Sequence, residues 1–394
     1  MNYWEVSLMD CQIKITDNKA VWKIQAALAL IFLLNPFLGV LSTLFFVFVS
    51  KEKSMAFYLV IILTLFMWCL QSTRSFHLGE PSDWAGNYYY NFHNAAITDT
   101  LTYLFFTTKE YAWQAFNLIG YYLFDGDFLS YANFIVALTY MFTFAAIYKF
   151  WNYIQADPRF LVASLCLFAF VTEVNGICNN LLRQQFAMSM MLYAIIERCT
   201  NGRILYPLLV ISFFTHTMTG FFIPFLFIRL GKKASFRFYI YIVLGFGLLY
   251  ILFTNLSIFS SSSFYAFQRL ATASNAYALK DIIQPSAVYP FLAVTVILYV
   301  KAFFFDSERR KCELYINNLF LILISMCLLM TSMPLMQTRY FIIRFFFMPL
   351  VVPYFFTAKG SLCDYYLITV PLCFAFRFFR KSTRATTPSL GMAL

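Results

Sequence analysis

The sequence has few charged residues for its length. Only 12% of its 394 residues are Asp, Glu, Lys or Arg, and 61% are hydrophobic. A soluble domain contains about 25% charged residues and about half apolar ones. The deficit excludes a soluble enzyme and a disordered chain. It also argues against a nucleic-acid-binding protein, because the 29 Lys and Arg residues lie mostly in short clusters between apolar runs, as in polytopic membrane proteins.

The sequence also has few residues that bind metals. It contains three histidines, and none of its nine cysteines forms a CxxC pair. Most of these cysteines lie inside apolar runs, where a small hydrophobic packing role is the expected one. We therefore expect neither a metal site nor a cofactor.

Long apolar runs are abundant, and they predict an all-α polytopic membrane protein. At about 20 residues per span, the length allows about 10–12 transmembrane helices in one domain over residues 1–394. A shorter amphipathic run at 111–124 suits a helix on the membrane surface. The predicted apolar segments are 24–49, 54–72, 129–150, 159–178, 181–197, 203–228, 237–255, 287–306, 314–333, 338–355 and 361–378.

Basic clusters between these runs predict the orientation of the chain in the membrane. Cytoplasmic loops of membrane proteins are enriched in Lys and Arg. This rule places residues 73–128, with their amphipathic helix, and residues 256–286 in two outer loops. The clusters used as cytoplasmic markers are Lys51/Lys53, Arg198/Arg203, Arg229–Arg237 and Arg309–Lys311.

The segment 203–228 does not fit this orientation as one straight span, because basic clusters flank both of its ends. Two half-helices that meet near His216 would return the chain to the cytoplasm. Each half has about 12 residues and reaches about 18 Å, past the middle of the membrane. Gly220 and Pro224 weaken the second half further. We therefore predict a broken hairpin, a structure tolerated at membrane depth only inside protein or beside a polar cavity.

Ionisable residues at membrane depth are costly and therefore mark candidate sites. Arg183 is expected in the first turn of a helix whose N-cap is Asn180, followed by Gln184. A helix N-terminus with an added guanidinium binds anions such as phosphate. The alternative is that Arg183 only neutralises Glu173, at the outer end of the preceding span.

His216 is predicted at a similar depth, at the break in 203–228. A neutral imidazole there can take a proton from a hydroxyl group near neutral pH. The alternative is a packing histidine that forms hydrogen bonds beside Thr215 and Thr217.

The first outer loop adds Arg74, Asp83 and Tyr88, since aromatic rings beside an acid are suited to binding sugars. Each has an ordinary alternative: Arg74 as an arginine that reaches the interface, Asp83 as a turn or cap residue, and Tyr88 as part of an aromatic belt. Further polar candidates are Arg269 in the second outer loop and Arg339 and Arg344 near the outer end of the penultimate span.

Several of these stretches resemble one known family. The order Arg74, Asp83, Tyr88 is similar to the first outer loop of EpsG-like bacterial polysaccharide polymerases. NNLLRQQFA at 179–187 and FFTHTMTGFFIP at 213–224 resemble the Arg-containing and His-containing segments of that family, and Arg339-Tyr340 resembles a later feature. The family includes the Wzy-type O-antigen polymerases.

The resemblance implies a metal-independent membrane glycosyltransferase of GT-C architecture in the bacterial inner membrane. Its donor and acceptor would be oligosaccharide repeat units linked through pyrophosphate to undecaprenol. Its other partners would be membrane lipids and a chain-length regulator, with no nucleic acid. His216 would be the base, with Asp83 as second choice. The implied substrate-binding residues are Arg183, Arg74, Arg339, Arg344, Gln184, Asn180, Tyr88, Arg269 and Glu173.

Three other functions remain open at this point. An O-antigen ligase would have a similar architecture. A flippase for lipid-linked oligosaccharides is a transporter, and transporters often contain two similar halves with paired broken helices. We find one broken segment and no such symmetry. For a membrane acyltransferase, the sequence offers only a lone histidine in the middle of the chain.

Overall fold

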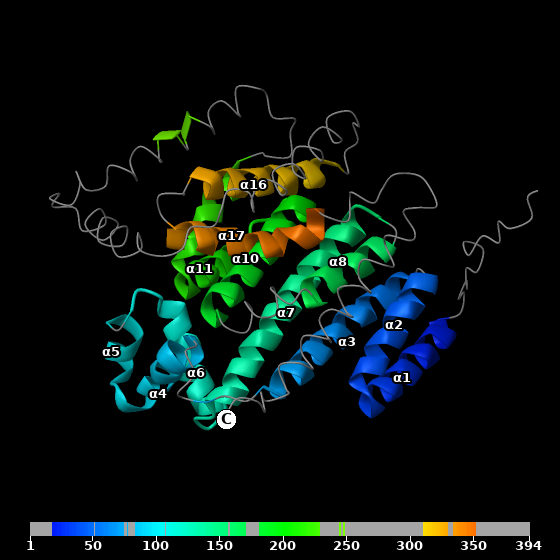
Figure 1. Ribbon diagram of the computed structural model, residues 1–394, viewed down its shortest axis with the longest axis horizontal. Helices are drawn as coiled ribbons and strands as arrows, with labels where there is room; N and C mark the ends of the chain where they lie inside the picture. The colour runs from blue at the N-terminus through cyan, green and yellow to red at the C-terminus, as the bar shows by residue number, and fades with distance from the viewer. Residues whose placement is uncertain are drawn as a thin grey trace, which may run out of the picture. The chain divides into compact units, whose positions relative to one another are not determined.

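A computed structural model of the chain (Figure 1) describes part of the sequence. Every regular element among the described residues is a helix, which confirms the predicted all-α class. The chain divides into two compact units, one of Met1–Ile223 with Phe356–Leu394 and one of Pro224–Phe355. The described residues are 18–50, 52–74, 77, 83–106, 108–156, 158–170, 181–228, 244–245, 247–248, 310–329 and 334–351. The expected second outer loop at 256–286 and the spans expected at 287–306 and 361–378 lie outside them.

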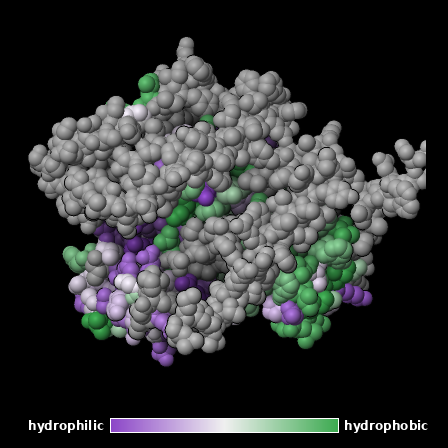
Figure 2. Space-filling view, in the orientation of Figure 1, coloured by the Kyte–Doolittle hydropathy of each residue, from purple (hydrophilic) through white to green (hydrophobic). Residues whose placement is uncertain are grey.

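The first apolar run forms two helices rather than one continuous segment. Helices α1 (Asn18–Leu34) and α2 (Pro36–Ser50) pack against each other and are joined by Asn35 alone. A residue before proline disfavours the helical conformation, and Pro36 suits the first position of a new helix. The Asn35 side chain then caps α2, because its Oδ1 accepts the backbone N–H groups of Phe37 and Leu38, each at 3.1 Å. An apolar patch covers the exposed side of this pair in Figure 2.

Two helices of the described residues are long and apolar enough to cross a membrane. They are Ser54–Ser72, in α3 (Lys53–Ser72), and α7 (Phe128–Tyr153). The two helices pack against each other, and α8 (Pro158–Phe170) packs against both. The remaining apolar helices are shorter: Ala20–Leu34, Pro36–Ser50, Pro158–Phe170, Tyr206–Thr215 and Thr217–Phe227.

The segment between α3 and α7 is a small helical layer with an aromatic core. It contains the π-helix η2 (Trp84–Tyr88), α4 (Tyr89–Ile97), α5 (Thr100–Phe105) and α6 (Tyr111–Leu123). The helix predicted at 111–124 is thus confirmed as α6. Rings of η2, α4 and α6 contact one another, as Tyr88 contacts Trp113 and Phe92 contacts Tyr121. Four large aromatic side chains of the layer are fully buried: Trp84, Phe92, Tyr103 and Trp113.

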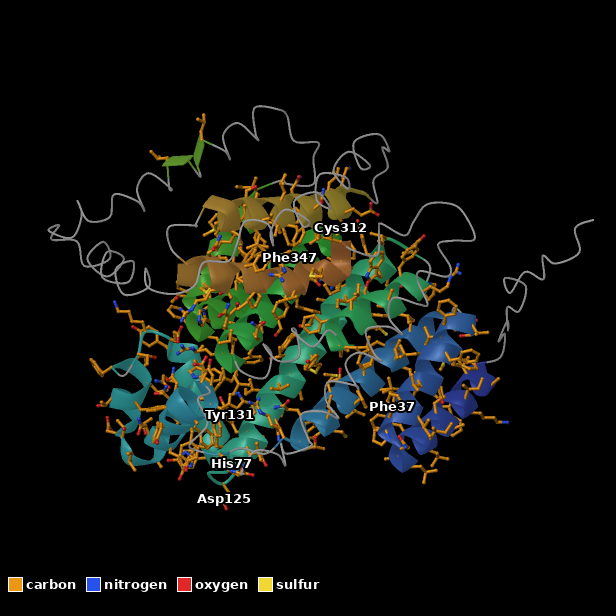
Figure 3. The ribbon with its side chains drawn as sticks, viewed as in Figure 1. Phe37, His77, Asp125, Tyr131, Cys312 and Phe347 are labelled. Atoms are coloured by element: carbon orange, nitrogen blue, oxygen red, sulfur yellow. The ribbon has the colours of Figure 1, made fainter. Side chains whose placement is uncertain are left out.

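A glycine lets α6 lie close to the first turn of α7. A Cβ atom on Gly120 would stand only 2.3 Å from the ring of Tyr131, so this position requires glycine. Tyr131 lies near the N-terminal end of α7 (Figure 3). Its hydroxyl donates to Asn117 Oδ1 on α6 at 2.8 Å. Asn117 in turn donates to Gln114 at 3.3 Å. This buried chain of hydrogen bonds fixes the position of α6, whose first turn adjoins the candidate site.

The helix pair that follows contains the predicted break. Helix α10 (Leu182–Asn201) packs on α7 and ends at Gly202, whose φ of 72° is left-handed. Helix α11 (Tyr206–Thr215) then packs on α10, tied by a hydrogen bond of 2.8 Å from Ser212 to the Ala187 carbonyl. The helix stops at His216, which is extended, and continues as the 3₁₀ helix η3 (Thr217–Phe222) and α12 (Ile223–Phe227). The helix break is confirmed; the return of the chain to the cytoplasm stays a prediction.

The described part of the second unit consists of α16 (Arg310–Leu329) and α17 (Pro334–Val351), which pack against each other, with the segment from Pro224. Gln337 of α17 donates to the Cys327 carbonyl at 3.0 Å, and Tyr315 of α16 donates to the Phe225 carbonyl at 2.8 Å. The first bond joins two consecutive helices, and the second joins residues 90 positions apart in the sequence.

Candidate active site

Arg183 lies in the first turn of α10, as predicted, but the N-cap of this helix is Leu181 rather than Asn180. The first helical hydrogen bond runs from the Gln185 N–H to the Leu181 carbonyl at 3.0 Å, which places the cap one residue later than expected. Leucine has no side-chain acceptor, so the N-cap residue does not cap the helix with its side chain. The Arg183 guanidinium forms an ion pair with Glu110. Its Nε is buried and has no hydrogen-bond partner.

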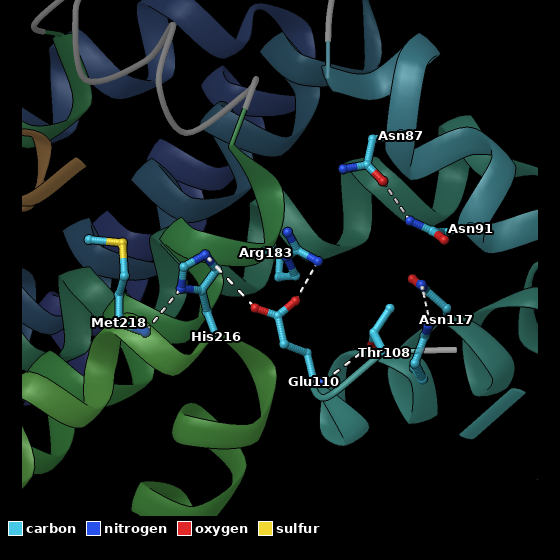
Figure 4. A network of polar contacts seen from close by, with 9 residues as sticks. Asn87, Asn91, Thr108, Glu110, Asn117, Arg183, His216 and Met218 are labelled. Atoms are coloured by element: carbon cyan, nitrogen blue, oxygen red, sulfur yellow. Dashed lines mark hydrogen bonds and ion pairs between the residues drawn. The ribbon is translucent and has the colours of Figure 1, made fainter. Parts of the chain in front are cut away.

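Glu110 occupies the N-cap position of α6 without capping it. Its side chain forms no capping hydrogen bond, while its own backbone N–H donates to Thr108 Oγ1 at 3.2 Å. The carboxylate instead turns toward α10 and the break after α11, where Arg183 and His216 converge on it (Figure 4). Its side chain is only 14% exposed, so the pairing neutralises a largely buried charge.

His216 is buried at the break between α11 and η3. Its Nδ1 accepts the backbone N–H of Met218 at 3.3 Å and so caps the 3₁₀ helix. Its Nε2 lies 4.0 Å from Glu110 Oε1. The structure therefore brings His216 and Arg183 to the same carboxylate.

Tyr88 forms one wall of this cluster. The Arg183 guanidinium carbon lies 6.0 Å from the centre of its ring, and the ring of Trp113 also contacts Tyr88, at 5.8 Å between centres. Burial raises the pKa of Tyr88 to about 12, although the positive charge of Arg183 opposes the shift. Tyr88 is thus a neutral hydroxyl at physiological pH.

The other predicted residues of the first unit differ in burial and in what they contact. Gln184 is buried in the first turn of α10. Arg74 follows α3 and stacks on Trp84, with its guanidinium carbon 4.2 Å from the ring centre. Asp83 is exposed at the N-cap of η2 and does not cap it.

The two late arginines belong to the second unit. Both lie on α17, and Arg344 stacks on Phe341 and Phe345 while donating to the Phe341 carbonyl at 3.2 Å. Three further predicted binding residues fall outside the described part of the chain: Glu173, Asn180 and Arg269.

Sequence reasoning missed Glu110. An acidic residue just before a helix is ordinarily explained by the helix dipole, so its residue type and position carried no special signal. Nothing in the sequence distinguishes Glu110 from the other acids between residues 73 and 128, such as Asp99 and Asp127. The expected partner of Arg183 was Glu173, and within the described residues the carboxylate found on Arg183 is Glu110. Among those residues, no group of three or more His, Cys, Asp and Glu could hold a metal ion.

Comparison with models of protein families identifies the family of this chain. The model of the EpsG family matches residues 57–389, most of the chain, including every residue of the cluster. The chain belongs to the EpsG family. Membership in EpsG, together with the apolar helices, indicates a polymerase-like membrane protein of polysaccharide synthesis. Comparisons with curated proteins and with solved structures find no match.

Proposed function

We propose that this EpsG-family chain is a multi-pass glycosyltransferase of the bacterial inner membrane, with GT-C architecture. It joins oligosaccharide repeat units carried on undecaprenyl pyrophosphate into O-antigen or a related surface polysaccharide at the outer face. Its architecture would include about 10–12 spans and the re-entrant segment at 203–228. Its partners would be lipid-linked donor and acceptor glycans, membrane lipids and a chain-length regulator, and it would work without a metal.

The observation that carries the proposal is the incomplete hydrogen bonding of Arg183. Its Nε is buried without a hydrogen-bond partner in the first turn of α10, whose N-cap residue Leu181 has no side-chain acceptor. An unsatisfied buried donor is unfavourable by about 1–3 kcal/mol, and an oxygen atom of a ligand would remove this cost. Arginine binds phosphate through two parallel hydrogen bonds, so a lipid-linked pyrophosphate suits this position.

The chemistry needs two kinds of groups, and the cluster contains both. When the acceptor hydroxyl attacks the donor sugar, negative charge develops on the pyrophosphate, and a fixed cation such as Arg183 stabilises it. Arg74, Arg339 and Arg344 are further candidates for this charge, and Gln184, Asn180, Tyr88, Arg269 and Glu173 for binding the glycan. The acceptor hydroxyl must also lose a proton, for which the sequence suggests His216 and then Asp83.

A deletion strain tests the proposal. Loss of a polymerase leaves surface lipid with a single repeat unit, whereas loss of a flippase leaves none. Loss of a ligase leaves long polymer that is not attached to the surface lipid. We expect a gel of surface glycan to show the single-repeat form, and full-length glycan in the deletion strain would refute the proposal.

A further inference from the structure

The two ring nitrogens of His216 have different surroundings. Nδ1 accepts the Met218 N–H, so in the neutral ring the proton lies on Nε2. Nε2 is the nitrogen that faces Glu110. The lone pair that a base needs is therefore occupied by the main chain. His216 therefore presents a hydrogen-bond donor toward Glu110, not an acceptor.

Glu110 is an acceptor where His216 is a donor, since an ionised carboxylate only accepts hydrogen bonds. Oε2 binds Arg183, and Oε1 lies 4.0 Å from His216 Nε2. That separation is too long for a direct hydrogen bond, which spans about 2.7–3.2 Å. One hydroxyl oxygen can lie about 2.8 Å from both atoms, donating its proton to Oε1 and accepting one from Nε2–H.

On this basis, and resting on the proposed function, we propose that Glu110 is the catalytic base on the acceptor side. His216 is then a positioning residue. The acceptor oxygen forms a bond to the anomeric carbon of the donor sugar while its proton passes to Glu110 Oε1. The bond between that carbon and the phosphate oxygen breaks, and its electron pair leaves on the pyrophosphate.

The ion pair between Glu110 and Arg183 also regulates this proton transfer. Carboxylate and phosphate oxygens compete for the same guanidinium N–H groups. Pyrophosphate that binds Arg183 through Nε and a neighbouring N–H group therefore competes with Glu110 for the guanidinium. A carboxylate that loses its neighbouring cation takes up a proton more readily. The base thus becomes effective only when a donor is in place.

The variant Glu110→Gln tests both parts, because it has the same shape without the charge. The full-length protein would be placed in lipid nanodiscs, with lipid-linked repeat units extracted from the deletion strain as substrate. We expect kcat to fall about 10²–10⁴-fold, the usual contribution of a general base. Inorganic pyrophosphate, used as the probe of Arg183, should bind about 10-fold more tightly, as expected when a charge-assisted competitor is removed.

Glu197 provides a matched control. It is also a buried glutamate, and it forms an ion pair with Lys149 near the opposite end of α10. Glu197→Gln should leave both kcat and pyrophosphate binding unchanged. If Glu110→Gln does not fold, Glu110→Asp keeps the charge but withdraws the carboxylate by one methylene. Its kcat should fall at least 10-fold, by the same loss of general-base contact.

The outcomes separate this inference from the proposed function. A Glu110→Gln or Glu110→Asp protein with the turnover of the wild type would overturn Glu110 as the base. Unchanged pyrophosphate affinity in Glu110→Gln would overturn the exchange on Arg183. Wild-type protein that does not join the repeat units would refute the polymerase proposal itself.

Discussion

Glu110, at the N-cap position of α6, points away from its own helix and binds Arg183 in the first turn of α10. The pair connects the layer of short helices after α3 to the packed α7–α10 pair. Both side chains are mostly buried, so removal of either one leaves a buried charge, at a cost of about 3–5 kcal/mol. Alanine variants would therefore mix a loss of folding with a loss of function, and informative substitutions must keep size or charge.

The first prediction concerns Arg183→Lys, which keeps the positive charge. A lysine ammonium can still neutralise Glu110, so the protein should accumulate normally on an immunoblot. It lacks the planar pair of N–H donors that grips phosphate oxygens. We therefore expect a gel of surface glycan to show mainly single repeat units.

The matched control for that prediction is Arg198→Lys, in the last turn of the same helix, where the guanidinium binds the Gly202 carbonyl. This strain should make full-length polymer. Full-length polymer from Arg183→Lys as well would show that bidentate phosphate binding by Arg183 is not required.

The second prediction distinguishes the roles of the two ring nitrogens of His216. In His216→Gln the side-chain amide can place an N–H near the position of Nε2, whereas in His216→Asn the shorter side chain can replace only Nδ1 as the cap of η3. If His216 positions the acceptor, the Gln variant should lose about 10-fold or less in kcat, the equivalent of one weakened hydrogen bond. The Asn variant should lose more. A loss of about 10²–10⁴-fold in both would identify His216 as the base.

The third prediction concerns Gly120→Ala. The added methyl group would stand 2.3 Å from the Tyr131 ring, and this ring is fully buried and bonded to Asn117. Such overpacking costs about 1–3 kcal/mol. Thermal unfolding in detergent should begin at a lower temperature, and turnover should fall because α6 carries Glu110 at its start. Gly86→Ala is the control, since nothing lies within 4 Å of its added Cβ, and equal stability of the two variants would contradict this account of the α6–α7 contact.

The helices themselves were largely predictable from the sequence, because they depend on the local pattern of apolar residues. The ends of α3, α6 and α7 lie within a few residues of the predicted ones. The break at His216 was expected because basic clusters flank both ends of the segment 203–228. The division of the first run at Asn35 was not predicted. Hydrophobicity is continuous there, and only the Asn-Pro pair marks the change.

The cluster itself was predictable only in part. Arg183 and His216 were recognised because ionisable groups at membrane depth are rare. Their common partner was not, because Glu110 reaches them only through the packing of α6 and α11, which is tertiary information. The N-cap of α10 was misplaced by one residue for a similar reason, since Asn180 is the better intrinsic cap and the hydrogen-bond pattern begins at Leu181.

The fourth prediction concerns Asp127, which caps α7 by accepting from the backbone of Leu129 and from the Ser130 hydroxyl. The bond from Ser130, more than the backbone bonds, lowers the pKa of Asp127 below its usual 3.8. Its charge therefore stabilises the fold above about that pH, and this contribution is lost as the pH falls through the lower folded pKa. Asp127→Ala should cost about 1 kcal/mol at neutral pH, as helix caps do.

The control for that prediction is Asp127→Asn, which keeps the capping oxygen without the charge. Its stability should depend less on pH than that of the wild type when thermal unfolding is followed from pH 6 to pH 3. An identical pH dependence in both proteins would assign the acid sensitivity to other carboxylates.

The last prediction concerns the path of 203–228 through the membrane. Helix α11 has 10 residues and reaches only about 15 Å before the break at His216, too short to cross alone. Basic residues flank both ends of the segment, and the positive-inside rule places both in the cytoplasm. In a variant without native thiols, single cysteines at Gly202 and Gly231 should both resist an impermeant thiol reagent in intact spheroplasts and react after lysis. A cysteine in the 83–106 layer, such as Asn87→Cys, should react in intact spheroplasts. If only one of the two glycine positions is protected, the segment crosses the membrane once and the orientation of every later helix is reversed.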